Sequence, residues 1–234
     1  MIHVPFYPRD PDVELLAPKP QPARKYYPQW MKDMPTEWTA PDGGTRKTAT
    51  SCVPFTDTFA NGYIQELVHD VRIIKLDSRN GKDFIQYQYG GMVKQVSTRE
   101  EKEGMPNPLP KFDGYYNTEM SWETLWEPQT PKGYSALYHH PNNRFDLPFH
   151  TMSGIIDTDK WNITGPIPFL IKEGFEGVIP AGTPIYQITF IKREHWKAEA
   201  HSYDESLIKK QRNTYSKVLQ NGFRRFFWEK KLYE

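Results

Sequence analysis

The chain has 234 residues, of which 30 are Lys or Arg and 29 are Asp or Glu, so its formal net charge is +1. This balance argues against a dedicated nucleic-acid binder, which needs an excess of clustered Lys and Arg. Aromatic residues make up 15% of the chain and Pro occurs 21 times, a composition that argues against disorder. No apolar run approaches the roughly 18 residues of a membrane span. The N-terminus lacks the pattern of a secretory signal, so we expect a reducing cytoplasm. The single cysteine, Cys52, is expected to be a buried, inert thiol.

Residues 1–50 are rich in proline and aromatic residues. Nine of the 21 prolines lie here, and each removes a backbone donor and biases the preceding residue toward extended geometry. This pattern excludes helix over most of the segment and predicts an extended arm. The aromatic side chains between the prolines indicate that the arm lies against a surface, which is either its own domain or a neighbouring subunit.

Residues 51–200 have the pattern of a single β domain. Short runs of β-branched and aromatic residues predict strands at residues 63–68, 71–76, 83–89, 134–138, 154–156, 167–171 and 184–191. An Asn80-Gly81 turn predicts a hairpin between the second and third strands. A charged run followed by prolines predicts a surface excursion at about 97–131. This close spacing is typical of an all-β sandwich or barrel and leaves no room for parallel β-α-β crossovers.

Residues 201–234 have the pattern of an amphipathic helix. Ser202 and Glu205 have the spacing of a capping box, which predicts a helix start. Apolar residues then recur at steps of three and four, and eight Lys or Arg stand against four Asp or Glu. The basic face is either a solvated surface or a contact for an anionic partner, such as nucleic acid or an acidic protein face.

The segment Gly154-Ile155-Ile156-Asp157-Thr158-Asp159 resembles a motif of the trimeric dUTPase and dCTP deaminase (β-clip) superfamily. Gly133-Tyr134 with Asn143-Arg144, and Gly182 to Gln187, resemble two further motifs of that superfamily. The resemblance implies a dUTPase-like β-clip or jelly-roll core and a homotrimer. It also implies that Asp157 would activate a water for attack on a phosphate, that Arg144 and Gln187 would bind phosphate oxygens, and that Mg²⁺ would be the cofactor. After Gly182 the only glycine is Gly222, so the superfamily's glycine-rich closing motif has no counterpart.

A pattern spread over nearly the whole chain resembles an uncharacterised family of tailed-bacteriophage proteins. It is carried by residues 51–57, 131–135, 141–149, 154–159 and 175–185. The resemblance implies a phage source and a location in the virion or the host cytoplasm.

A histidine-rich segment raises a separate question of metal binding. His139, His140 and His150 flank Asp146, and two His with one carboxylate is the ligand set of a non-haem iron site. The same residues equally fit a loop whose polar groups satisfy its own backbone, and we predict no metal.

We therefore predict a mainly β, non-enzymatic phage structural or accessory protein that is virion-associated and assembles through its arm and its helix. Its predicted partners are further copies of itself and other phage structural proteins, with no membrane, and with nucleic acid only at the basic helix. No cofactor is expected. The alternative is a nucleotide-binding protein or a dUTPase-like pyrophosphatase that acts on nucleoside triphosphates with Mg²⁺.

Overall fold

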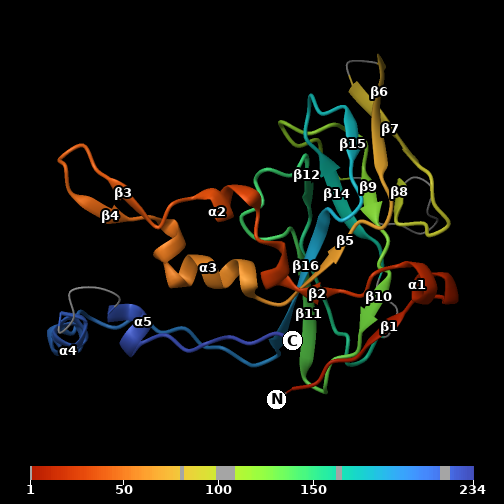
Figure 1. Cartoon of the computed structure of the whole chain (residues 1–234). Helices are drawn as coiled ribbons and strands as arrows, with labels where there is room; N and C mark the ends of the chain where they lie inside the picture. The colour runs from red at the N-terminus through yellow and green to blue at the C-terminus, as the bar shows by residue number, and fades with distance from the viewer. Residues whose placement is uncertain (1, 80–81, 99–108, 162–164, 217–221) are drawn as a thin grey trace.

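A computed structural model of the chain describes residues 2–79, 82–98, 109–161, 165–216 and 222–234. Short antiparallel strands dominate these residues, so the predicted mainly β fold class is confirmed (Figure 1). The strands are β1 (Phe6–Pro8), β2 (Gln21–Pro22), β3 (Glu37–Thr39), β4 (Thr45–Lys47), β5 (Tyr63–Glu66), β6 (Val71–Arg79), β7 (Lys82–Tyr89), β8 (Val96–Thr98), β9 (Met120–Trp122), β10 (Trp126–Pro128), β11 (Tyr134–His139), β12 (Phe149–Thr151), β13 (Gly154–Ile156), β14 (Ile167–Ile171), β15 (Gly177–Ile179) and β16 (Pro184–Lys192). The helices are α1 (Pro11–Leu16), α2 (Gln29–Asp33), α3 (Val53–Ala60), α4 (Glu205–Tyr215) and α5 (Gly222–Phe226), with single 3-10 turns at η1 (Ala23–Tyr26) and η2 (Ala49–Ser51).

Two sheets and a long hairpin form the body of the molecule. A five-stranded sheet has the order β13-β11-β16-β5-β2, and a four-stranded sheet has the order β12-β14-β9-β8. A three-stranded sheet, β15-β6-β7, carries the hairpin predicted around Asn80-Gly81, although those two residues lie outside the described residues. Alternate residues of each sheet turn inward, as Ala136 and Tyr138 do on β11, and meet in one hydrophobic core.

The centre of this core is an aromatic stack around Trp122, which is fully buried. Its ring lies parallel to that of Phe169 at a centroid distance of 3.6 Å and edge-on to Phe149 at 5.1 Å. The indole Nε1 donates to Thr151 Oγ1 at 3.0 Å, and this hydroxyl donates to the Ile185 carbonyl on the five-stranded sheet at 2.6 Å. The stacked rings lie within the four-stranded sheet, and the Thr151 hydroxyl links them to the five-stranded sheet through a satisfied polar chain.

Part of the segment expected to be a surface excursion is buried. Residues 120–128, which form β9, a connection and β10, are all buried, so the prediction of a surface excursion at about 97–131 is wrong for this stretch. One of its two acidic side chains, Glu123, has a partner distant in the sequence: Ser97 Oγ donates to Glu123 Oε1 at 2.6 Å. Burial of a carboxylate is tolerated when such hydrogen bonds are present. Residues 99–108 of the predicted excursion lie outside the described residues.

The first part of the N-terminal arm packs on the body. β1 pairs with β10, β2 pairs with β5, and Val13 of α1 is fully buried in a small second core. Helix occurs here against expectation: α1 begins at Pro11, with Asp10 Oδ1 accepting from the Val13 amide at 2.9 Å. A proline in the first helical turn loses no hydrogen bond, because that amide has no intrahelical partner.

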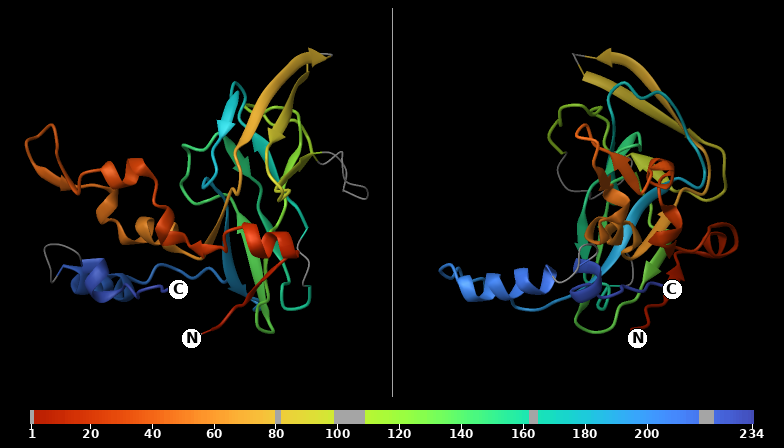
Figure 2. Two further views of the ribbon diagram at one scale, coloured as in Figure 1. Left: turned by 45° about the vertical axis from the view of Figure 1, so that its right-hand side comes forward. Right: turned by 60° about the vertical axis from the view of Figure 1, so that its left-hand side comes forward.

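Residues 29–60 project from the body together with the C-terminal segment (Figures 1 and 2). This projection is held by an aromatic cluster in which Phe59 contacts Tyr27, Trp30 and Phe55. Its last element, α3, falls where the sequence pattern predicted the start of the strand region, and Pro54 lies in its first turn. Cys52, at the helix N-terminus, is exposed, so the expectation of a buried thiol is wrong.

The C-terminal segment leaves the body after β16 at Arg193, carries α4 and α5, and returns to α3 at Trp228. The predicted helix is present, but Asp204 caps it: its Oδ1 accepts from the Ser206 and Leu207 amides. The helix therefore begins at Glu205 and does not use the predicted Ser202 cap. No helix in the described part of the chain is long and apolar enough to cross a membrane.

Candidate functional site

Asp157 follows β13 and is held by the edge of the five-stranded sheet. Its Oδ1 accepts from Ser135 Oγ at 2.7 Å and lies 3.1 Å from an Arg193 guanidinium nitrogen. Nζ of Lys160 lies 3.9 Å from the other carboxylate oxygen. The side chain is 46% exposed, so the carboxylate is open to solvent on one side and ion-paired on the other. A carboxylate engaged in this way positions the turn that follows β13.

Arg193 organises this corner of the sheet. Its guanidinium group donates to the Tyr134 carbonyl at 2.7 Å, to Ser135 Oγ at 2.9 Å and to Asp159. Asp159 is almost fully buried and also accepts from the Gly133 amide at 2.8 Å. These two hydrogen bonds, with that of Arg193 the stronger, lower the pKa of Asp159 to about 2. The carboxylate is therefore fixed in its charged form at neutral pH and is unsuited to accept a proton.

Gln187 is buried in the body, although the sequence analysis proposed it as a phosphate contact. Its Oε1 accepts from the Asn142 amide at 2.9 Å, and its Nε2 donates to the Thr58 carbonyl at 3.2 Å and to the Asn61 carbonyl. The amide thus has partners on both sides and ties β16 to α3 and to the loop after β11. In this arrangement it has no exposed group for a phosphate.

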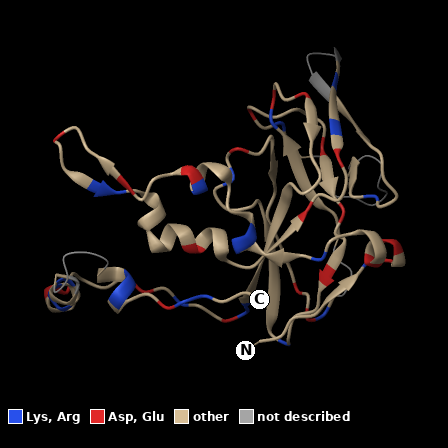
Figure 3. Ribbon diagram, in the orientation of Figure 1, with Lys and Arg blue, Asp and Glu red and all other residues tan. Residues whose placement is uncertain are grey.

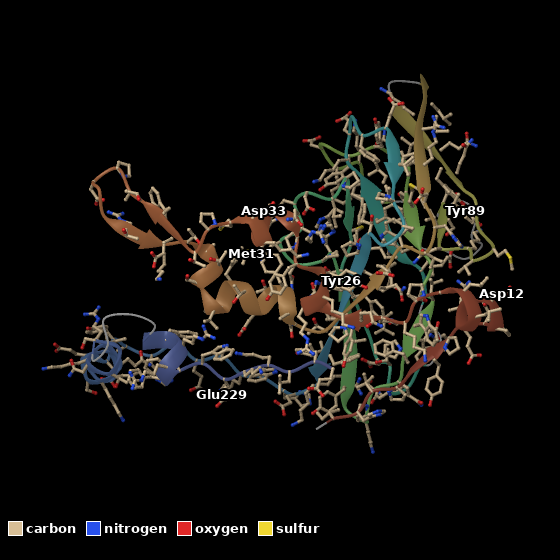
Figure 4. All side chains as sticks on the ribbon, viewed as in Figure 1. Asp12, Tyr26, Met31, Asp33, Tyr89 and Glu229 are labelled. Carbon is tan, nitrogen blue, oxygen red and sulfur yellow. The ribbon has the colours of Figure 1, made fainter. Side chains whose placement is uncertain are left out.

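Arg144 faces Asp146, not a pocket for an anion. Its Nε and one terminal nitrogen donate to the Asp146 carboxylate at 2.9 and 2.8 Å, and the other terminal nitrogen donates to the Tyr26 carbonyl at 3.4 Å. Burial works to raise the pKa of Asp146, but the hydrogen bond and charge of Arg144 lower it below its ordinary value. Tyr26, labelled in Figure 4, comes from the N-terminal arm, so this ion pair also fastens the arm to the body.

The three residues proposed for phosphate chemistry do not meet in one chain. Arg144 and Gln187 line the same small crevice. Asp157, in contrast, is held by Ser135, which pairs with Ile191, whereas Gln187 pairs with His139. Ser135 and His139 are four residues apart on β11, which corresponds to about 13 Å along a strand. Asp157 therefore lies at the opposite end of β11 from the other two residues.

The histidines proposed as metal ligands line one open cleft, and the ring nitrogens of His139 and His140 have partners there. The His140 ring accepts from the Thr151 amide at 3.2 Å and lies 3.1 Å from the Arg144 carbonyl, while His139 contacts the His140 carbonyl and Thr189. His150 stacks on His140 at 4.7 Å between ring centroids. Within the described ranges, no three His, Cys, Asp or Glu residues are grouped to hold a metal ion. The Asp146 carboxylate is paired with Arg144, so it is not directed at the three histidines.

Burial is the main influence on these histidines. It lowers the pKa of His140 to about 4 and also lowers the pKa of His139 and of His150. All three rings are therefore neutral at pH 7.

The C-terminal segment is the second candidate site. Its last residues dock on the body: Trp228 Nε1 donates to Asp57 Oδ2 at 2.8 Å, Lys231 Nζ lies 3.0 Å from the same oxygen, and Tyr63 OH donates to the Glu234 carbonyl at 3.0 Å. Between these anchors and Arg193, in contrast, large apolar side chains are exposed, with Trp196 85% exposed. The exposed large apolar residues here are Trp196, Tyr203, Leu207, Phe223, Phe226, Phe227 and Leu232.

Two features of these sites were missed from the sequence. Arg193 belongs to no recognisable motif, because it is a single arginine after a strand. It contacts Asp159 only because β16 and β13 both pair with β11. The Asp57 anchor for the C-terminal segment links residues 171 positions apart, and no local pattern indicates such a pair.

Comparison with known proteins yields little. No family model matches the sequence, and no curated protein matches it. Among solved structures, the chain is similar to the dUTPase from phage phi11 of S. aureus at 14% sequence identity, over 48% of this chain and 99% of that one, with a TM-score of 0.27. At that TM-score the likeness carries no argument about site or function, and the fold class rests on the strands described above.

Proposed function

We propose that the protein is a non-enzymatic structural or accessory component of a phage particle, and that it assembles through segments that project from its β core. The proposal includes a β-clip or jelly-roll core of the dUTPase type, partners that are copies of this chain or other particle proteins, and no cofactor. The phage setting rests on the sequence resemblance.

The observation that carries the proposal is the exposed apolar surface of the C-terminal segment. Isolated exposed apolar side chains are ordinary, but seven large ones occur among the described residues between 196 and 232, on a segment that projects from the body (Figure 1). Surfaces of this kind in soluble proteins are usually contacts for other molecules. An assembly contact would remove these side chains from water.

The candidate catalytic residues support the same proposal. Asp157, Arg144 and Gln187 each have internal partners, and Asp157 is far from the other two in one chain. Hydrolysis of a triphosphate needs a positioned base and free cationic groups around the phosphates. Here the guanidinium groups nearest to these residues are already paired with carboxylates.

The test uses the full chain. Light scattering over a range of protein concentrations should give masses above the 27.5 kDa of one chain, and dUTP or dCTP with Mg²⁺ should show no turnover. A thermal-shift series with the same nucleotides should show no stabilisation, whereas a ligand at 100 times its Kd would add about 2.7 kcal/mol. A monomer at every concentration, or turnover that the Asp157→Asn variant loses, would overturn the proposal in favour of the nucleotide-acting alternative.

A further inference from the structure

Helix α1 presents an acidic and apolar face to solvent. Val13 points into the second core, while Leu15 is 80% exposed and Leu16 is 41% exposed. Asp12 and Glu14 are also exposed, and neither forms an ion pair with another described residue. Figure 4 shows Asp12 at the outer edge of the molecule. This short helix therefore offers two leucines and two unpaired carboxylates.

Helices α4 and α5 present the complementary chemistry. A groove of about 630 Å³ is lined by Gln211, Arg212, Ser216, Phe223 and Phe227. Phe226 is exposed beside it, at the end of α5. Five cationic side chains lie on these two helices, and none forms an ion pair with a residue in the described ranges: Lys209, Lys210, Arg212, Arg224 and Arg225.

The two surfaces lie on opposite sides of the molecule. In Figure 1 α1 is at the right and α4 and α5 are at the left, and the right-hand view of Figure 2 agrees. Figure 3 shows acidic residues on α1 and basic residues on α5. The two faces therefore cannot meet within one copy.

Charge decides which second surface fits the groove. If two copies joined through their α4–α5 faces, cations would face cations, and like charges placed together in an interface cost several kcal/mol. If α1 of one copy entered the groove of another, leucines would meet phenylalanines and carboxylates would meet Lys and Arg. This pairing buries both apolar faces and neutralises charge on both sides.

We propose that α1 of one copy docks into the α4–α5 groove of the next copy, so that the chains join head to tail. The inference rests on the proposed assembly function and names the partner surface for it. A head-to-tail contact uses two different patches, so after pairing one copy keeps a free groove and the other keeps a free α1. Such contacts close into rings or extend as filaments, according to the rotation between neighbours.

The test uses two full-length variants that each disable one patch. Leu15→Lys places a positive charge on α1 opposite the cations of the groove, and Phe227→Asp places a negative charge in the groove opposite the carboxylates of α1. Each change removes apolar burial in the contact and should weaken self-association about tenfold or more. Phe145→Asp, which alters a side chain that is 81% exposed on another loop, is the matched control. Circular dichroism checks that all three variants retain the fold.

The decisive experiment mixes the variants. Each alone should be monomeric in light scattering, whereas an equimolar mixture should form a complex of two chains through the intact groove of the Leu15→Lys chain and the intact α1 of the Phe227→Asp chain. The control should assemble like the wild type, and added salt should weaken all of these complexes because it screens the charges.

The remaining outcomes separate this inference from the proposed function. If the wild type assembles but the mixture stays monomeric, or if either variant alone assembles like the wild type, the α1–groove contact is wrong while assembly stands. If the wild type is monomeric at every concentration, both fail. Binding of duplex DNA by a monomeric wild type, lost in a charge-reversed Arg225→Glu variant, would overturn the inference and assign the basic face to an anionic polymer.

Discussion

Asp57 is the residue whose removal most directly tests how the C-terminal segment is held. Its Oδ2 accepts from Trp228 Nε1 and pairs with Lys231, and both contacts disappear in Asp57→Ala. Alanine is a strong helix former, so α3 should remain intact. The substitution therefore removes the polar anchor of the last residues without breaking the helix that carries it.

The size of the effect follows from the exposure of the two contacts. A hydrogen bond to a charged group contributes about 1.5–3 kcal/mol when buried, and the Asp57 side chain is only 25% exposed. Lys231 is 51% exposed, so its ion pair adds well under about 1 kcal/mol. We expect a loss of about 2 kcal/mol in docking free energy, which raises the undocked fraction roughly 30-fold.

Limited trypsin digestion followed by mass spectrometry measures this fraction. Cleavage after Lys231 requires the segment to leave α3, and when opening is fast its rate tracks the population of the open form. Cleavage there should accelerate about 30-fold in Asp57→Ala, while the β core remains intact. Asp33→Ala, on α2 in the same projection, is the matched control and should leave the rate unchanged. A change of less than about twofold in Asp57→Ala would show that Asp57 does not hold the segment, and the energetic reasoning above would be wrong.

Three further predictions concern the body. Phe169→Ala removes the ring stacked on Trp122 and should lower the free energy of unfolding in urea by about 3–5 kcal/mol; a loss below about 1 kcal/mol would contradict the central place of this stack. Asp159 has a folded-state pKa of about 2, below its ordinary value of 3.8, so its ion pair with Arg193 should stabilise the fold above pH 4 and lose this effect as the pH falls toward 2. Thermal unfolding of Asp159→Asn should therefore converge with that of the wild type in acid, and a gap that persists at pH 2 would refute the pairing. His140 has a folded-state pKa of about 4 against an ordinary 6.5, so the unfolded chain takes up the proton first and stability should fall by roughly 3 kcal/mol from pH 6.5 to 4. In His140→Gln this loss should be smaller, and an identical pH profile would exclude His140 as its source.

The strands that the sequence predicted correctly are those whose pattern lies within the segment itself. Residues 134–138 and 184–191 have long runs of strand-favouring residues between Gly and Pro, and both are strands in the structure. β9 and β10, with three residues each, are too short for a periodic pattern, and they follow the charged run and prolines that predict a surface excursion. Glu123 is tolerated in the interior through partners distant in the sequence, Ser97 and Arg9, and such partners cannot be recognised from a local pattern.

Prolines misled the prediction at the N-terminal side. Their number predicts that helix is excluded over most of residues 1–50, yet Pro11 occupies the first turn of α1, where the missing amide costs nothing. The position of a proline within an element, which depends on the residues that cap it, therefore matters more than the number of prolines.

The sequence predicted which residues belong to the candidate site. It could not predict how those residues are placed relative to one another. Asp157 does follow the strand predicted at residues 154–156, which is β13. Its pairing with Arg193, 36 positions away, depends on the antiparallel register of β11 with β16. A sequence motif contains the residues of a site but does not contain the other groups that neutralise them.

The C-terminal segment is attached to the body at two places, since it leaves at Arg193 and is fastened again at Trp228 and Tyr233. A helix pair held at both ends has fewer orientations available than a tail held at one. Less freedom is then lost when a neighbour binds, so the contact can be tighter for the same buried area. The direction in which α4 and α5 project is thus determined by the chain itself before any neighbour arrives.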